Sequence, residues 1–562
     1  MRRIPKSLLL ASLSSNPFPR RNPLPLPLLR PPPNPLPRVL PPFAAAARTL
    51  TAPVAPPEPA AVAAAAVKPD GIELLEAAEQ REAASDHQEA FGLAIKALEP
   101  LQASHGGWSL PVVRTLRLAG AAATRLGRLS DGLESLNAAA EIIDSLESVD
   151  KEVAAVGAAV HEQLARTKTA MGRRWDAVPE LMRALELKAI LLEEGSLELG
   201  NAYKDVAEAY TGVLCFEKAL PLCLKALEIS ENQFGGESPE VAKIRQLLAT
   251  VYAGLGRNEE ALEQNEIVRM VYEKLGLDVE LSLAENDVAN MLILLGRSEE
   301  AMDVLKRVIK RASKESEERA LAFVAMAKIL CFQDKSADSK RCLEIAREIL
   351  DSKVSVSPVR VAQVYAEVSM LYESLTEFEV ALCLMKKTLM FLDGVSEMQQ
   401  MQGSLSSRMG WLLLVTERVD EAVPYLESAV EKLKNCFGPL HFGLGFSYKH
   451  LGEAYLAMNQ TESAVKYLTI ARDIINSAFG PKHEDSIEAI QSLANAYGVM
   501  GSYKRAMECQ EQVIDAYRSC GPGALDDLKE AHRLRHQLKM KAQGLPHAVF
   551  PANSLPVIRS RE

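Results

Sequence analysis

Few residues of this 562-residue sequence have types and spacings suited to catalysis or metal binding. His532 and His536 lie four residues apart with Glu530 before them, so one helix face would carry two imidazoles. Their order differs from the H-E-x-x-H pattern of zinc proteases and no third ligand is evident, which favours a surface helix. Segment 443–445, Gly-Leu-Gly, lacks the third glycine of a dinucleotide-binding loop and sits in an expected helix.

The residues that could act as nucleophiles also form no known catalytic motif. No G-x-S-x-G or P-loop pattern occurs, and the eight cysteines form no C-x-x-C pair. They are Cys215, Cys223, Cys331, Cys342, Cys383, Cys436, Cys509 and Cys520. We interpret them as reduced thiols of a non-secreted protein. The sequence therefore predicts a protein that is not an enzyme and holds no cofactor or metal.

The elements that would position any site follow a repeated frame, clearest in residues 491–506. There Ala494 supplies a small residue, Tyr497 an aromatic, Gly501 a turn and Ala506 the start of a second helix. A glycine between two helical stretches ends the first in a left-handed conformation. This stretch predicts two helices joined by a tight turn.

The same frame recurs along the chain with a period near 42 residues. The positions that open each second helix are Ala90, Gly132, Ala177, Ala219, Ala261, Ala301, Ser339, Ala381, Ala422, Ala464 and Ala506. Twelve residues before them stand Ala78, Gly120, Ala165, Ala207, Ala249, Ala289, Ala327, Ser369, Gly410, Gly452 and Ala494, all small. Small residues let two helices approach closely. A constant period over eleven units predicts a helical solenoid.

This frame resembles the tetratricopeptide repeat, whose usual unit has about 34 residues. The longer unit here looks like that of kinesin light chains, as do the junctions at 234–239 (FGGESP), 437–441 (FGPLH) and 479–483 (FGPKH). The resemblance covers about residues 70 to 520. It implies an all-α, right-handed tetratricopeptide-repeat superhelix of about eleven hairpins. Kinesin light chains also carry a heptad coiled coil ahead of their repeats, and residues 1–68 contain no heptads.

Composition divides the chain into four parts. Residues 1–68 are expected to form a transit peptide and a disordered Pro/Ala-rich segment, and residues 69–523 the repeat array. Residues 524–543 should form a C-terminal capping helix, which an open solenoid needs to cover its last apolar face. Residues 544–562 are expected to be a disordered tail. No apolar run is long enough to span a membrane.

The first fifty residues have a targeting composition. They hold eight basic residues and no acidic one, and 17 of the 31 prolines fall within residues 1–60. Such an Arg-rich, acid-free segment is typical of organelle import sequences. The excess of arginine over hydroxyl residues favours mitochondria, with the chloroplast as alternative. A Pro-rich binding tail of a cytoplasmic protein is the interpretation if the segment is retained.

The concave wall of such a superhelix is built from the first helix of each hairpin. Its exposed positions are expected two and three residues before the small residue and one after it. They are Lys204, Asp205, Glu208, Gln246, Asn286, Asp287, Asn290, Ser407, Arg408, Lys449, His450, Glu453, Gln491, Ser492 and Asn495. Amides that both donate and accept suit an extended peptide, and mixed charges would select its side chains. A merely solvated helix face is the alternative.

We therefore predict a non-enzymatic scaffold or adaptor that binds a partner protein in its groove, inside an organelle. One alternative is a cytosolic motor or cytoskeleton adaptor related to kinesin light chains. Another is an organellar RNA-binding helical repeat protein, although those use units of about 35 residues and a basic groove. Beyond residue 50 the chain carries 56 basic and 74 acidic residues, a net charge of −18, which disfavours nucleic acid.

Overall fold

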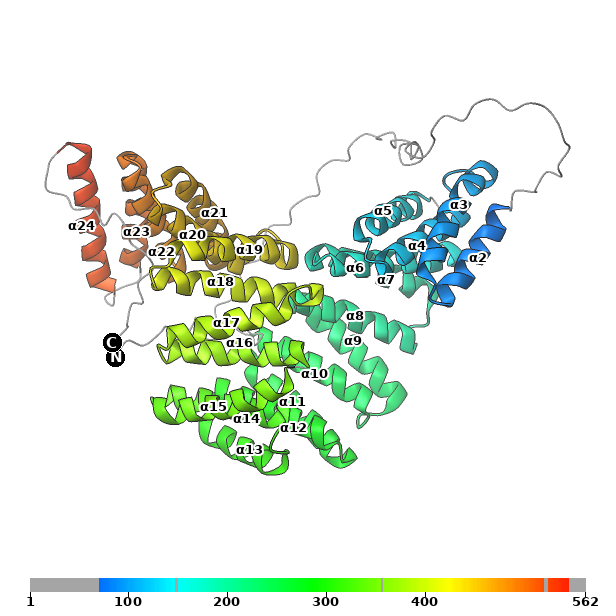
Figure 1. The fold of residues 1–562 in the computed structure, drawn as a ribbon, viewed down its shortest axis with the longest axis horizontal. Helices are drawn as coiled ribbons and strands as arrows, with labels where there is room; N and C mark the ends of the chain where they lie inside the picture. The colour runs from blue at the N-terminus through cyan, green and yellow to red at the C-terminus, as the bar shows by residue number, and fades with distance from the viewer. Residues whose placement is uncertain (1–69, 147–149, 355–356, 520–523, 545–562) are drawn as a thin grey trace.

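A computed structural model describes residues 70–146, 150–354, 357–519 and 524–544, and every regular element there is helical (Figure 1). The helices form eleven successive antiparallel hairpins and one final helix. The first helices of the hairpins are α2 (Gly71–Ala83), α4 (Leu110–Arg125), α6 (Lys151–Ala170), α8 (Leu197–Gly212), α10 (Pro239–Gly254), α12 (Asp278–Leu294), α14 (Glu317–Phe332), α16 (Pro358–Ser374), α18 (Gln399–Val415), α20 (Phe442–Ala457) and α22 (Glu484–Val499).

The second helices pack against them in the same order. They are α3 (His87–His105), α5 (Leu129–Ser145), α7 (Arg174–Leu191), α9 (Phe216–Phe234), α11 (Asn258–Leu275), α13 (Ser298–Arg311), α15 (Ser336–Lys353), α17 (Phe378–Leu392), α19 (Val419–Phe437), α21 (Thr461–Phe479) and α23 (Tyr503–Ser519). A short 3₁₀ turn, η2 (Ser396–Met398), precedes α18, and α24 (Leu525–Ala542) packs on α23. The predicted all-α repeat fold is confirmed, whereas the predicted transit peptide and tail, 1–68 and 544–562, lie almost wholly outside the described residues.

Each hairpin is closed at the two small positions of the frame. All eleven residues at each position are buried. In one hairpin the Ser339 hydroxyl donates to the carbonyl of Ala327, 2.8 Å away, so one helix touches the backbone of the other. A Cβ added at Gly120 would lie 3.1 Å from the carbonyl oxygen of Gly132. The twelve-residue spacing therefore marks the point where the two backbones meet.

Every hairpin turn contains one residue in the left-handed conformation. Five of these are the glycines predicted from the sequence, Gly127, Gly172, Gly256, Gly296 and Gly501. The other six are not glycine: Ser85, Leu214, Asp334, Thr376, Glu417 and Asn459. Because a side chain strains this conformation, the geometry of the turn is imposed by the packed helices as well as by local preference.

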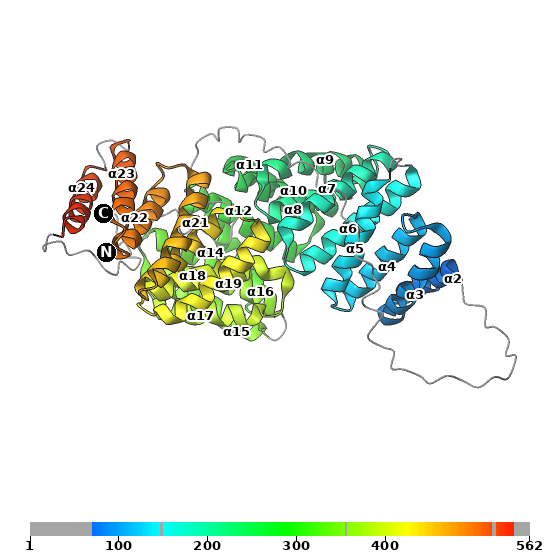
Figure 2. The ribbon, with the colours of Figure 1, turned by 90° about the horizontal axis from the view of Figure 1, so that it is seen from above.

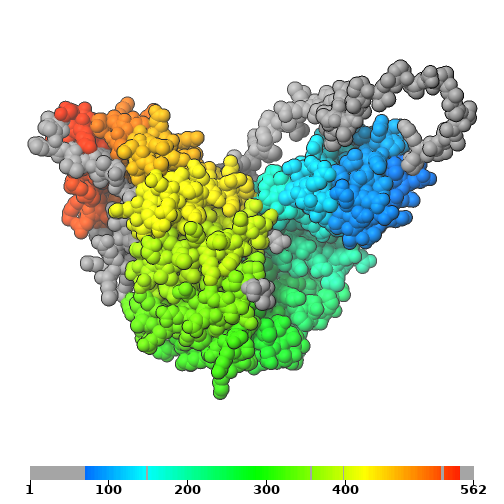
Figure 3. Space-filling view, viewed as in Figure 1, coloured from blue at the N-terminus to red at the C-terminus, as the bar shows by residue number. Residues whose placement is uncertain are grey.

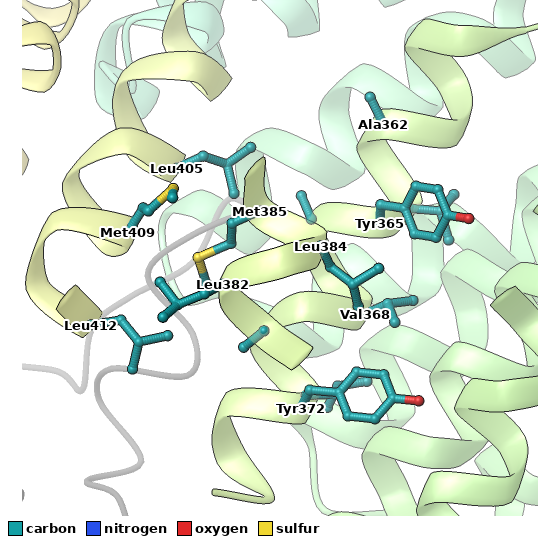
Figure 4. Close-up of a cluster of buried hydrophobic side chains, with 14 of the residues drawn as sticks. Ala362, Tyr365, Val368, Tyr372, Leu382, Leu384, Met385, Leu405, Met409 and Leu412 are labelled. Atoms are coloured by element: carbon teal, nitrogen blue, oxygen red, sulfur yellow. The ribbon is translucent and has the colours of Figure 1, made fainter. Parts of the chain in front are cut away.

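The buried apolar side chains form clusters that span neighbouring hairpins. Figure 4 shows part of one cluster, where Met385 of α17 lies near Leu405 and Met409 of α18, while Tyr365 of α16 points to the other side of the cluster. Each hairpin thus buries one face against its partner helix and another against the next hairpin. This arrangement is the reason that isolated repeats of this kind are not stable.

The array curves until its third and ninth hairpins meet (Figure 1 and Figure 2). In the space-filling view the cyan and yellow surfaces touch (Figure 3). We call this contact the clasp and define it by Gly172, Trp175, Gln399, Cys436 and Gly438. The Cys436 thiol lies 3.6 Å from the Gly172 carbonyl oxygen, and a Cβ on Gly438 would lie 2.8 Å from the Trp175 ring. The clasp joins segments 264 residues apart in the sequence.

Leu214 extends the clasp from the turn of the fourth hairpin. Its φ is 60°, and its side chain packs against a cluster that includes Phe437 and Leu444. Leucine is disfavoured in this conformation by roughly 1–2 kcal/mol. Its packing against the ninth and tenth hairpins offsets that cost, so the strain at this turn is linked to closure of the array.

Substitution of Gly410 tests the close packing of the two helices within a hairpin. A Cβ there would overlap Leu426 of α19. We expect Gly410→Val to lower the free energy of unfolding by about 1–3 kcal/mol through overpacking, measured by denaturant unfolding. Gly92→Val is the matched control, because nothing lies within 4 Å of a Cβ at that helical position. Equal stability of the two variants would contradict the account.

Removing the Trp175 ring tests the clasp. We expect Trp175→Ala to increase the radius of gyration in small-angle X-ray scattering without lowering helicity, because the hairpins themselves stay intact. Trp108→Ala is the control, since Trp108 is half exposed and takes no part in the clasp. An unchanged radius for both variants would show that the clasp does not hold the array closed.

Candidate partner-binding groove

First helices of neighbouring hairpins lie on the inner side of the curve. Direct contacts join α2 with α4, α4 with α6, α8 with α10, α12 with α14, α14 with α16, α18 with α20, and α20 with α22. Elements on the inside of a curved stack come closer together than those outside. The sequence placed the candidate site residues on these helices, and the structure agrees with that placement.

A cavity of about 320 Å³ opens between four of these helices. We call it the groove cavity. It is lined by Gln246 of α10, by Leu283, Asn286, Asp287 and Asn290 of α12, by Leu321 and Ala325 of α14, and by Glu367 of α16. Four residues predicted for the concave wall are therefore brought together, from two hairpins. The volume lies at the lower end of the roughly 300–1,000 Å³ of small-ligand sites.

Two carboxylates give the groove cavity its electrostatic character. Water reaches Asp287, yet the surrounding protein desolvates its carboxylate, and this burial together with the charge of Glu367 raises the pKa of Asp287 to about 7. Burial likewise raises the pKa of Glu367, against the smaller opposing effect of Lys328. Within the described part of the chain, no cation forms a salt bridge with either carboxylate.

Asn286 links two neighbouring first helices, α12 and α14. Its amide nitrogen donates to the carbonyl oxygens of Ser282, at 3.1 Å, and of Glu318 on α14, at 3.2 Å. The side chain was expected to be exposed, but only 4% of its surface is accessible. Its amide oxygen has no hydrogen-bond partner among the described residues. Asn286 is therefore both a structural link between hairpins and an acceptor at the cavity wall.

A smaller pocket of about 70 Å³ lies nearer the N-terminus. Asp205 lines it with Glu162 and Lys188, which pair with each other. Lys204 lies 3.9 Å from Asp205 and 4.0 Å from Glu208, and both carboxylates are exposed. The three predicted residues of α8 thus form a charged, solvated surface apart from the groove cavity.

Arg408 is not an exposed groove residue, which corrects the prediction. Its guanidinium forms two hydrogen bonds of 2.7 Å with Glu373, whose side chain is fully buried. This bidentate pair joins α16 to α18. Although Arg408 lies two residues before the small Gly410, its guanidinium turns toward the buried Glu373 of the preceding hairpin.

A buried network likewise replaces the exposed surface predicted on α20. Lys449 lies 3.5 Å from Glu453 and 3.1 Å from Glu488, and Ser492 donates to Glu453 at 2.8 Å. Burial disfavours the ionised Glu453, yet Lys449, His450 and Ser492 lower its pKa to about 2. Burial opposes the charge of Lys449 too, but Glu453 and Glu488 raise its pKa. These groups hold α20 to α22.

The amides of α22 interact with each other. Gln491 donates to Asn495 at 3.1 Å, as their four-residue spacing allows, and Asn495 is buried although it was predicted to be exposed. Among residues two before a small position, Asp205 and Asp287 are exposed, whereas Arg408 is paired with Glu373.

Glu367 is the residue that the sequence analysis missed. It stands two residues before Ser369, the small position of its hairpin, and so occupies the same register as Asp205 and Asp287. Applying the register rule to every hairpin would have found it. Its position between two apolar residues, Ala366 and Val368, gave no separate signal of function.

The described residues contain no group of three or more His, Cys, Asp or Glu side chains arranged to hold a metal ion. His532 and His536 lie exposed on α24. The seven described cysteines are free thiols. None of the described helices is both long and apolar enough to cross a bilayer.

Comparisons with known proteins support this repeat architecture. Models of the tetratricopeptide repeat match residues 198–267, 402–474 and 487–520. The chain is 29% identical over 336 residues to Protein KINESIN LIGHT CHAIN-RELATED 1 of Arabidopsis thaliana, covering 59% of this chain and 55% of that protein. It is 24% identical over 376 residues to Protein KINESIN LIGHT CHAIN-RELATED 2 of the same plant, covering 65% and 56%. The chain thus spans about half the length of the curated relatives it matches.

Among solved structures, the chain matches the repeats of a Podosopora anserina kinesin light chain with 20% identity and a TM-score of 0.32. That match covers 36% of this chain and 95% of that structure. The matched segments are tetratricopeptide repeats, and the chain is similar to plant proteins named for kinesin light chains. The fold is an all-α tetratricopeptide-repeat fold.

The raised pKa of Asp287 predicts a pH-dependent effect on stability. Because the folded state holds this proton to about pH 7 while the unfolded state releases it near pH 4, stability falls as pH rises between these values. We expect Asp287→Asn to stabilise the protein at pH 8 by on the order of 1 kcal/mol after solvent screening, with little gain at pH 4. Denaturation midpoints at the two pH values measure this, with exposed Glu263→Gln as control. A gain that is equal at both pH values would contradict the assignment.

Breaking the buried pair on α18 should cost far more than breaking a surface pair. Arg408→Met leaves the fully buried Glu373 without its cation, and we expect a loss of about 3–5 kcal/mol in unfolding free energy. Arg418→Met removes a solvent-exposed partner of Glu421, and its loss should be much smaller. Similar small losses for both would mean that the Arg408 pair is solvated.

Proposed function

We propose that this protein is a non-enzymatic scaffold or adaptor whose concave wall binds an extended segment of a partner protein. The groove cavity carries this proposal, because it gathers amides, carboxylates and apolar side chains from four successive first helices. Amide groups can both donate to and accept from a peptide backbone. The tetratricopeptide repeats support the same class of activity, protein–protein interaction.

The construction of the wall favours binding of an extended chain. Its side chains come from helices fixed by buried pairs such as Arg408 with Glu373, so little conformational freedom is lost on binding. Curvature presents them along one continuous surface, as in other solenoids. Most of the conformational entropy lost on binding then comes from the flexible partner segment, as is usual for segments that fold on binding.

Location inside an organelle is part of the proposal, with the mitochondrion favoured and the chloroplast as alternative. It rests on the Arg-rich, acid-free composition of residues 1–50. The N-terminus of the native protein, determined by mass spectrometry, tests it. Cleavage around residues 40 to 65 is expected, whereas an intact Met1 would contradict import.

A second candidate is a cytosolic motor or cytoskeleton adaptor. Similarity to two proteins named for kinesin light chains favours it. Because the chain spans about half of each relative, their whole activity is not transferable by similarity alone. An intact N-terminus together with recovery of a kinesin heavy chain would make this candidate the better one.

Capture of partners by two matched variants tests the groove directly. The groove variant combines Gln246→Ala, Asn290→Ala and Leu321→Ala, which trim the cavity wall and leave the inter-hairpin link of Asn286 intact. The control variant combines Glu263→Ala, Met270→Ala and Ile345→Ala on exposed faces of second helices. We expect the groove variant to lose at least tenfold in recovery of partners by quantitative mass spectrometry, with unchanged circular dichroism. Equal recovery from both would place binding outside the groove.

A further inference from the structure

The groove cavity has an unbalanced charge. Asp287 of α12, in the sixth hairpin, and Glu367 of α16, in the eighth, both line it. Within the described residues, no salt bridge neutralises the charge of either carboxylate. Lys328, one residue after the small position of α14, is the cation whose field reaches Glu367. Two partly desolvated carboxylates in one cavity repel each other, and a bound cation would relieve that cost.

The amide oxygen of Asn286, in the same wall, also lacks a hydrogen-bond donor among the described residues. The Asn286 side chain is 4% exposed, its amide nitrogen is used by two backbone carbonyls, and its amide oxygen accepts no hydrogen bond. A buried acceptor without a donor costs free energy. Asn286 belongs to the wall of this cavity, so its oxygen is a candidate acceptor for an N–H group of a bound segment.

The remaining lining suits a long side chain. Leu283, Leu321 and Ala325 supply apolar surface, on which the methylene groups of lysine or arginine can pack while the charged end reaches the carboxylates. The cavity volume corresponds to roughly ten water molecules at about 30 Å³ each, which exceeds the needs of a single metal ion. Arginine offers five N–H donors, enough to serve both carboxylates and the Asn286 oxygen.

We propose that the groove cavity binds the arginine or lysine side chain of an extended partner segment, between Asp287 and Glu367. This inference rests on the proposed function, because it specifies the chemistry of the segment that the concave wall receives. It also gives the protein a selection rule, since an acidic segment would add a third negative charge to the cavity and be rejected.

Degenerate peptide pools test the proposal on the full chain. Each pool has one fixed central residue, arginine, lysine, citrulline, leucine or glutamate, between randomised flanks. Citrulline keeps the shape of arginine without its charge. Retention on immobilised protein is compared for the wild type, for the pair Asp287→Asn with Glu367→Gln, and for the control pair Glu263→Gln with Glu344→Gln. Both pairs remove two negative charges, but the control residues are exposed on α11 and α15.

We expect the arginine and lysine pools to be retained about tenfold better than the citrulline pool by the wild type and by the control pair. The cavity pair should lose this preference and keep its helicity. A preference that survives in the cavity pair would overturn the assignment of the cavity. Equal retention of all pools would overturn the inference and leave the proposed groove function intact, whereas retention of none would overturn both.

Small cations provide the last comparison. Spermidine alone and calcium chloride alone are titrated into the wild type and the cavity pair by calorimetry. Weak or absent heat relative to the arginine pool is expected, because neither probe fills the apolar part of the wall. Tight binding of either probe that disappears in the cavity pair would reassign the cavity to a free cation and overturn the side-chain proposal.

Discussion

The close backbone contact within each hairpin is the constraint on which the rest of this structure depends. Two positions twelve residues apart must both be small, because the helices touch there, as the bond from Ser339 to the Ala327 carbonyl shows. That contact sets the angle of the hairpin and therefore the surface that it offers to its neighbour. Repeated eleven times, one local geometry produces the curvature, the inner wall and finally the clasp between the third and ninth hairpins.

The inner wall combines two different kinds of polar group. Near the C-terminal hairpins, charges such as Lys449 and Glu453 are paired and buried, so they fix one hairpin against the next. In the groove cavity, Asp287 and Glu367 are not paired in this way, and their pKa values are raised. Paired groups of this kind stabilise the array, while unpaired ones make part of the wall receptive to a ligand. Polar groups on the first helices thus stabilise the array in one place and, in our proposal, bind a partner in another.

The sequence predicted the repeat fold well because its signal is repeated. The frame from Ala78 to Ala506 fixed eleven hairpins, and the turn glycines matched left-handed residues. It predicted the candidate site less well, since exposure depends on the neighbouring hairpin: Arg408 and Lys449 were expected to face solvent but pair with residues of adjacent helices. The clasp was not predictable from local pattern, because it depends on small rotations accumulated over six hairpins.

Site-specific photo-crosslinking tests the central claim most directly, namely that a partner segment lies along the inner wall. A photoreactive amino acid is placed at Leu321 in the groove cavity, and in a second protein at Ile345 on the exposed face of α15. The account predicts crosslinks to one partner segment from Leu321 and none to that segment from Ile345. Crosslinks to the partner from Ile345 alone would contradict it and move recognition to the outer face.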